Sequence, residues 1–138
     1  MAARPPAAIV FHDLAQAVAA LSAAAAARRP VALWSAPGAA LYLGCGWFAA
    51  VERRARAAAP GAEVRFVLDC ADRADLVQEA FAEGITDACF AGSPALAERL
   101  AEIAHKSRAR PHRRRPRALD LAGLRELEAT LRDFLGGN

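Results

Sequence analysis

Cysteine is scarce in this sequence, and the pattern of the few cysteines excludes two kinds of stabilisation. The 138 residues include only three: Cys45, Cys70 and Cys89. Their number is odd, their spacings are wide, and no CxxC or CxxH pattern occurs, so we expect neither a disulfide framework nor a structural zinc site. A reducing compartment suits such a chain best.

Long apolar segments are also lacking. The longest run, near residues 17–27, is rich in alanine and too short to cross a bilayer. At the N-terminus only Arg4 precedes an apolar stretch that His12 and Asp13 interrupt, which makes a poor signal peptide. We therefore expect a cytoplasmic protein that does not associate with membranes.

Alanine and arginine dominate what is present. There are 38 alanines and 17 arginines, but only one lysine. Alanine favours helix but fills little volume, so the larger apolar residues carry the pattern. Hydrophobic residues make up 55% and charged residues 24%. A chain of this length and composition folds without a metal or disulfide, and we expect residues 1–138 to form a single domain.

Apolar runs and helical spacings alternate along the chain. Runs typical of strands cover residues 8–11, 31–35, 64–68, 85–90 and, as a short edge strand, 118–121. Helical spacing covers residues 14–28 and 47–59, the stretches around 76–81 and 96–103, and a C-terminal helix at about 121–135. This alternation predicts an α/β fold, a doubly wound parallel sheet of four or five strands that is flavodoxin-like in general plan.

Polar residues follow several predicted strands. Sheets of this class bind ligands at the carboxyl ends of their strands, so these residues are candidates for a ligand-binding edge. They are His12, Asp13, Ser35, Cys70 and Asp72. Asp13 is also a natural N-cap for the following helix. Cys70 and His12 make a nucleophile and base pair only if the first and third strands are neighbours.

A glycine motif is a candidate for binding a nucleotide cofactor. Residues 44–49 match G-x-G-x-x-G/A, and Asp69 lies 20 residues past Ala49. Glycines permit close approach of a phosphate to a helix N-terminus, and an acid accepts hydrogen bonds from ribose, so Gly44, Gly46 and Asp69 are the candidate cofactor residues. This interpretation requires a strand at residues 39–43. The alternative is that residues 39–59 are mostly helix and the glycines allow tight packing.

Two family resemblances follow from these stretches. Leu43-Gly44-Cys45-Gly46 with Val67-Leu68-Asp69 resembles the first two motifs of adenosylmethionine-dependent methyltransferases, which implies that cofactor. Residues 80–84, followed by a short strand and Ser93-Pro94, resemble the C-terminal half of response-regulator receiver domains. There Ser35 takes the place of the phosphorylated aspartate and no lysine precedes Pro94, so that resemblance implies architecture without phosphotransfer. The two resemblances assign residues 31–49 differently.

A strongly basic segment lies late in the chain. Residues 105–118 carry seven positive side chains and no acid, so with a net charge of +3 the remainder sums to −4. Arginine suits phosphate, which makes Arg113, Arg114 and Arg115 candidates for binding an anion or nucleic acid. No aromatic residue is interleaved for base stacking. The alternative is a solvated basic loop.

No complete catalytic or metal-binding constellation emerges from these residues. The sequence therefore predicts a non-catalytic ligand-binding or protein-binding module, with a homo-oligomer as one expected assembly because the stripe from Leu124 to Leu135 could dock on a second chain. The alternatives are a nucleotide-cofactor-binding protein that uses the Gly44 loop and a polyanion binder that uses the basic segment. The identity of a cofactor stays open.

Overall fold

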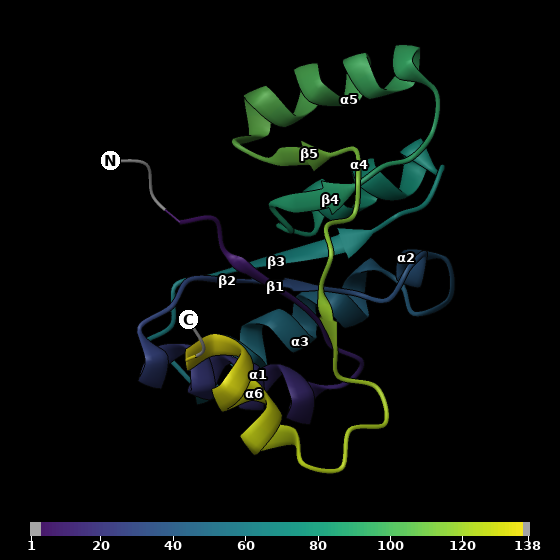
Figure 1. Cartoon of the computed structure of the whole chain (residues 1–138). Coiled ribbons are helices and arrows are strands. Elements are labelled where there is room, and N and C mark those ends of the chain that lie inside the picture. The colour runs from purple at the N-terminus through teal and green to yellow at the C-terminus, as the bar shows by residue number, and fades with distance from the viewer. Residues whose placement is uncertain (1–3, 137–138) are drawn as a thin grey trace.

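The computed structural model describes residues 4–136 and shows an α/β domain with a six-stranded sheet (Figure 1). The strands are β1 (Ala7–Val10), β2 (Val31–Trp34), β3 (Val64–Asp69), β4 (Asp87–Cys89), β5 (Arg110–His112) and β6 (Leu119–Asp120). The helices are α1 (Leu14–Ala27), α2 (Ala39–Tyr42), α3 (Cys45–Ala58), α4 (Ala74–Ala82), α5 (Pro94–Ser107) and α6 (Leu127–Gly136). Every strand pair is parallel, and the spatial order is β5-β4-β3-β2-β1-β6.

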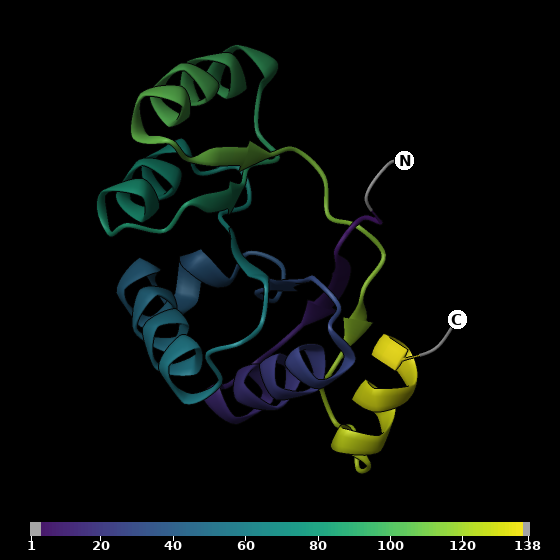
Figure 2. The same ribbon diagram turned by 90° about the vertical axis from the view of Figure 1, so that its left-hand side faces the viewer.

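The helices pack on one face of this sheet. Side chains alternate along each strand, so Ile9, Leu33 and Phe66 join the main core with the helices. The strand residues that alternate with them point to the opposite face. They form a smaller cluster that contains no helix residue: Ala8, Val10, Ala32, Trp34, Val67 and Cys89. Figure 2 shows the helices along the outer side of the curved sheet. We call the other side the open face.

The α/β class and the all-parallel sheet are thus confirmed, with six strands rather than four or five. The sequence predicted a doubly wound sheet, with helices on both faces, and this is corrected to helices on one face. β–α–β connections are right-handed. When every connecting helix lies on one face of the sheet, each new strand is therefore added at the same edge, beside the strand before it. This produces the sequential order from β1 to β5. The same arrangement builds the wall of a (β/α)8 barrel, whose ligand sites lie at the carboxyl ends of the strands.

Residues 39–43 settle one alternative that the sequence left open. They do not form a strand, because Ala39–Tyr42 is the short helix α2 and Leu43 is its C-cap. Ala39 and Ala40 are the buried residues of this helix, whereas the side chains of Leu41, Tyr42 and Leu43 are 51%, 65% and 40% exposed. Small residues on one side let α2 lie flat on the end of the sheet, and the large ones remain in solvent.

The basic segment is more ordered than the predicted loop. Its first residues complete α5, the next form β5, and the remainder crosses the open face to reach β6 at the far edge of the sheet, as Figure 1 shows. The C-terminal helix begins at Leu127 rather than near residue 121. It packs beside α1 through Leu131 and Leu135. Among the helices of residues 4–136, none is both long and apolar enough to cross a membrane.

Candidate functional site at the carboxyl edge

A cavity of about 250 Å³ lies at the carboxyl ends of β1 and β2. The strand ends and the two helices that follow β2 supply its lining: Phe11, His12, Ser35, Ala36, Ala39, Tyr42, Leu43 and Trp47. The rings of Phe11 and Trp47 stack with their centroids 6.5 Å apart and their planes at 16°. Tyr42 and Leu43 are also solvent-exposed, so they stand at the rim. The cavity therefore has apolar and aromatic walls and opens beside α2.

His12 brings an ionisable group to this cavity. Its Nε2 donates to Oδ1 of Asp120, 2.6 Å away, from the end of β6. Its backbone N–H donates to Oε1 of Gln16, whose amide in turn donates to the Leu121 carbonyl. These contacts fix the imidazole between β1 and β6 at the cavity wall, with the His12 side chain 33% exposed.

Asp120 is held as a carboxylate. Partial burial raises its pKa, but the hydrogen bond from the Ala122 N–H at 2.9 Å, the hydrogen bond and electrostatic attraction from His12 and the positive charge of Arg115 outweigh that effect. The pKa of Asp120 therefore lies below its ordinary value. A carboxylate behind a histidine orients the ring and selects its tautomer, as in many sites that bind or move a proton.

The centre of the edge is closed by the chain itself. Ser35 is 1% exposed, and its hydroxyl accepts from the Asp69 N–H at 2.9 Å and donates to the Ala36 carbonyl at 3.0 Å. Asp69 accepts from the Ala71 N–H and, at 3.0 Å, from Nη1 of Arg115. Nη2 of Arg115 donates to the Ser35 carbonyl at 2.9 Å, and its guanidinium lies 5.2 Å from the Trp34 ring centroid. Ser35 and Asp69 thus have internal partners.

The cysteines are buried thiols. Cys70 is fully buried, and desolvation, with nearby Cys45 and Asp69, raises its pKa to about 12. Desolvation likewise raises the pKa of Cys45 to about 12 and that of Cys89 to about 11. The condition for a Cys70 and His12 pair is not met, because β2 separates β1 from β3. All three thiols stay protonated at neutral pH, which opposes nucleophilic chemistry.

The remaining residues of the predicted edge do not join the cavity. Asp13 caps α1, where its Oδ1 accepts from the Gln16 N–H at 2.8 Å. Asp72 is exposed in the turn before α4. Within residues 4–136, no group of three or more histidine, cysteine, aspartate or glutamate side chains is placed to hold a metal ion.

The two glycines of the motif lie at the start of α3. Gly44 is its N-cap with φ +88°, a conformation that side chains rarely adopt, and Gly46 lies in its first turn. Gly44 links two helices rather than a strand and a helix, so the strand that the cofactor interpretation required is absent there. Asp69 is bonded to Arg115 instead of facing open space. The geometry therefore gives the cofactor interpretation little support.

The three arginines of the basic segment have different surroundings. Arg113 donates to the carbonyls of Phe90 and Gly92, both at 2.9 Å, and lies 5.5 Å from the Phe90 ring centroid. Arg115 is bound to Asp69 as described above. Arg114 is exposed and has no hydrogen bond or ion pair with another residue of 4–136. Two of the three therefore stabilise the fold, which removes them from a free anion-binding surface.

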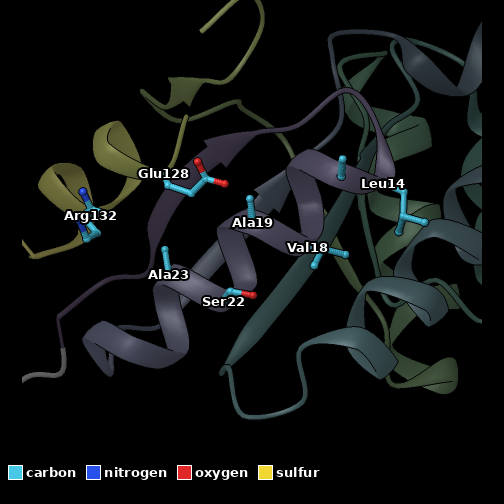
Figure 3. Close-up of a pocket in the computed structure, with 8 residues that line it drawn as sticks. Leu14, Val18, Ala19, Ser22, Ala23, Glu128 and Arg132 are labelled. Atoms are coloured by element: carbon cyan, nitrogen blue, oxygen red, sulfur yellow. The ribbon is translucent and has the colours of Figure 1, made fainter. Parts of the chain in front are cut away.

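A wider groove of about 880 Å³ lies between two helices on the helical face. Helix α1 contributes Leu14, Ala15, Val18, Ala19, Ser22 and Ala23, and α6 contributes Glu128 and Arg132. Figure 3 shows the small side chains of α1 along the groove and the two charged side chains on the α6 side. Its apolar floor, with one acidic and one basic side chain beside it, suits a macromolecular contact better than a small polar ligand.

Sequence reasoning missed Asp120, the residue that holds His12. The two lie 108 residues apart, and no local pattern connects them. The one usable signal was the short apolar run at 118–121, because Asp120 follows the same rule as His12 and stands at the carboxyl end of a strand. The rim residues Tyr42 and Leu43 were missed because their exposure depends on α2.

Comparisons with known proteins inform the fold alone. No family model matches the chain, and no curated protein matches it. A crystal structure described as a candidate fructose-1,6-biphosphate aldolase from Coccidioides immitis superposes with a TM-score of 0.61 and 18% sequence identity over 77% of this chain. The match spans 44% of that chain, less than half of its length. At this identity the similarity supports the α/β architecture and carries no activity to this chain.

Proposed function

We propose that this chain is a non-catalytic binding module that takes a small molecule in the carboxyl-edge cavity. The observation that carries the proposal is the position of His12, which Asp120 holds at 2.6 Å in the wall of a cavity otherwise lined by aromatic and small side chains and Leu43. A mostly apolar pocket with one fixed polar group is the usual form of a small-ligand site.

The size and chemistry of the cavity limit the ligand. A volume of about 250 Å³ is below the range of roughly 300–1,000 Å³ typical of sites for drug-sized ligands, so a dinucleotide does not fit within it. The walls favour a planar apolar molecule, and His12 favours one hydrogen-bonding group on its edge. Small aromatic alcohols and indoles are compounds of this class.

The absence of an activated nucleophile favours binding over covalent chemistry among the described residues. The Ser35 hydroxyl is already both donor and acceptor, and Cys70 has a raised pKa and no exposure. Because His12 has no nucleophile among residues 4–136 to activate, we assign to His12 and Asp120 the role of orienting a bound ligand.

A thermal-shift titration tests this proposal. Phenol and indole are compared with NAD, adenosylmethionine and FMN, and a ligand at one hundred times its Kd stabilises the fold by about 2.7 kcal/mol. Ala36→Leu fills the cavity, and Ala57→Leu on the exposed side of α3 is the matched control. We expect shifts from the small compounds that Ala36→Leu abolishes and Ala57→Leu keeps. Shifts that survive Ala36→Leu, or none from any small compound, refute the proposal.

A second proposal concerns assembly: two copies of the chain associate through the groove between α1 and α6. In a two-fold arrangement each contact occurs twice, so Glu128 of one copy meets Arg132 of the other. The two side chains lie four residues apart on α6 and are both exposed, and no ion pair joins them within residues 4–136. Small residues on α1 permit close approach of a second helix pair.

Light scattering after gel filtration tests the association. The wild type is expected to run as a dimer, Glu128→Arg as a monomer, and the double variant Glu128→Arg with Arg132→Glu as a dimer again. Arg54→Glu on α3, away from the groove, is the control. A monomeric wild type at 100 μM, or a double variant that stays monomeric, contradicts this assembly.

A further inference from the structure

A second hollow lies on the open face, away from the carboxyl-edge cavity. Its volume is about 480 Å³. The lining comes from the N-terminal lead-in, the strands and the segment that follows β5: Pro5, Pro6, Ala8, Ala32, Trp34, Arg65, Val67, His112, Pro116 and Arg117. None of these residues lines the carboxyl-edge cavity, so the two sites can be tested separately.

The strand register explains why the sheet is hollow there. Ala8 pairs with Ala32, and Ala32 pairs with Arg65, so two small side chains stand side by side next to an arginine. In the next row on the same face Trp34 pairs with Val67. Two alanines beside a row of large side chains leave a depression with an apolar floor.

The charged side chains that line this hollow, Arg65 and Arg117, are both basic. Arg65 is 43% exposed and Arg117 is exposed, while the acid nearest to Arg65, Asp87, is 3% exposed. Asp87 accepts from Nε2 of His112 at 2.9 Å and from the Thr86 hydroxyl at 2.8 Å. Oδ1 of Asp87 lies 4.0 Å from Nη1 of Arg65, which makes this a long and weak ion pair. Neither Arg65 nor Arg117 makes a side-chain hydrogen bond to another residue of 4–136, so the N–H donors of both can bind an outside anion.

We propose that this hollow is a ligand site for an aromatic carboxylate, with the ring on Ala8 and Ala32 and the carboxylate on Arg65 and Arg117. Trp34, Val67 and Pro116 form the apolar walls beside the ring. Arginine binds carboxylate through two parallel N–H donors, which gives such a site both charge and orientation. The volume lies within the usual range for small-molecule sites of roughly 300–1,000 Å³.

Calorimetric titration of the full chain with 2-naphthoate tests this proposal, and the neutral 2-naphthalenemethanol serves as the matched ligand. We expect Arg65→Gln to weaken naphthoate at least about tenfold, the effect of one charge-assisted hydrogen bond, and to leave the alcohol within about twofold. Arg54→Gln, an exposed arginine on α3, is expected to change neither. Ala32→Leu and Ala8→Leu fill the hollow and are expected to abolish both.

Three results overturn the proposal. The first is no binding of naphthoate at millimolar concentration. The second is equal affinity in wild type and Arg65→Gln. The third is naphthoate binding that Ala36→Leu removes, because the compound then occupies the carboxyl-edge cavity. Arg65 is half exposed on the surface of the sheet, so its variant tests the site even if the alanine variants fold poorly.

Discussion

Replacement of Arg115 by alanine is expected to destabilise the fold more than replacement of any other arginine in the basic segment. Its guanidinium donates to Asp69 at 3.0 Å and to the Ser35 carbonyl at 2.9 Å, and packs 5.2 Å from the Trp34 centroid. Asp69 is 6% exposed and keeps only the Ala71 N–H as a donor once Arg115 is gone. A nearly buried carboxylate without its counter-charge is costly.

The magnitude follows from these contacts. Each charge-assisted hydrogen bond contributes about 1.5–3 kcal/mol and a partly exposed cation–π contact about 0.5–1 kcal/mol. The Arg115 side chain is 25% exposed, and water replaces part of what is lost. We therefore expect a loss of about 2–4 kcal/mol in the free energy of unfolding, which lowers Tm by roughly 8–16 °C for a chain of this size.

Urea unfolding followed by circular dichroism measures this loss. Arg114→Ala is the control, because Arg114 is exposed beside Arg115 and its removal is expected to change stability by less than about 0.5 kcal/mol. A cycle that combines Arg115→Ala with Asp69→Asn isolates the ion pair. If Arg114→Ala and Arg115→Ala cost the same, or if the cycle shows no coupling, the assigned role of Arg115 is wrong.

Three further predictions concern the thiols, one glycine and one carboxylate. The three cysteines, all buried with raised pKa, should react with a disulfide reagent at pH 8 only after urea unfolds the chain; a fast phase in the native protein contradicts their burial. Gly92→Ala places a Cβ in steric conflict with the buried ring of Phe90 and should cost about 1–3 kcal/mol in urea unfolding, whereas no loss would mean that the ring moves freely. The pKa of Asp120 is lowered in the folded state, so it stabilises the fold at pH above its unfolded value, near 4, and this contribution disappears as pH falls through the folded pKa. Unfolding curves of Asp120→Asn and wild type should differ by less than about 1 kcal/mol at pH 7 and converge once the pH falls below the folded pKa of Asp120, and a difference that persists at about pH 2 contradicts the lowered pKa of this carboxyl.

Local elements were largely predictable from the sequence. The apolar run at 64–68 forms β3, Asp13 caps α1, and Ser93 with Pro94 starts α5 as its N-cap and first residue. These features depend on neighbours within one turn of helix or one strand, so a short window contains the necessary information. There are two exceptions. Burial of two alanines against the sheet makes residues 39–43 the helix α2, and pairing with β4 makes Arg110–His112 of the predicted basic loop the strand β5.

Part of the candidate site was predictable for the same reason. His12 and Ser35 line the carboxyl-edge cavity because strand ends of a parallel sheet meet at one edge. The assembly of that edge was not predictable. His12 binds Asp120 across 108 residues, and Arg115 reaches Asp69 across 46. Both contacts exist because the chain after β5 crosses the open face to add β6 beside β1.

The sequence by itself determined that this chain is an α/β domain, where most of its strands lie and which polar residues end them. Hydrophobic periodicity and helix capping depend on residues close together in the sequence, so they do not depend on the order of the strands in the sheet. The tertiary structure decided that the helices share one face, that Arg113 and Arg115 serve as internal partners and that hollows remain at the carboxyl edge and beside Ala32. These properties depend on the order and register of the strands, which long-range packing selects.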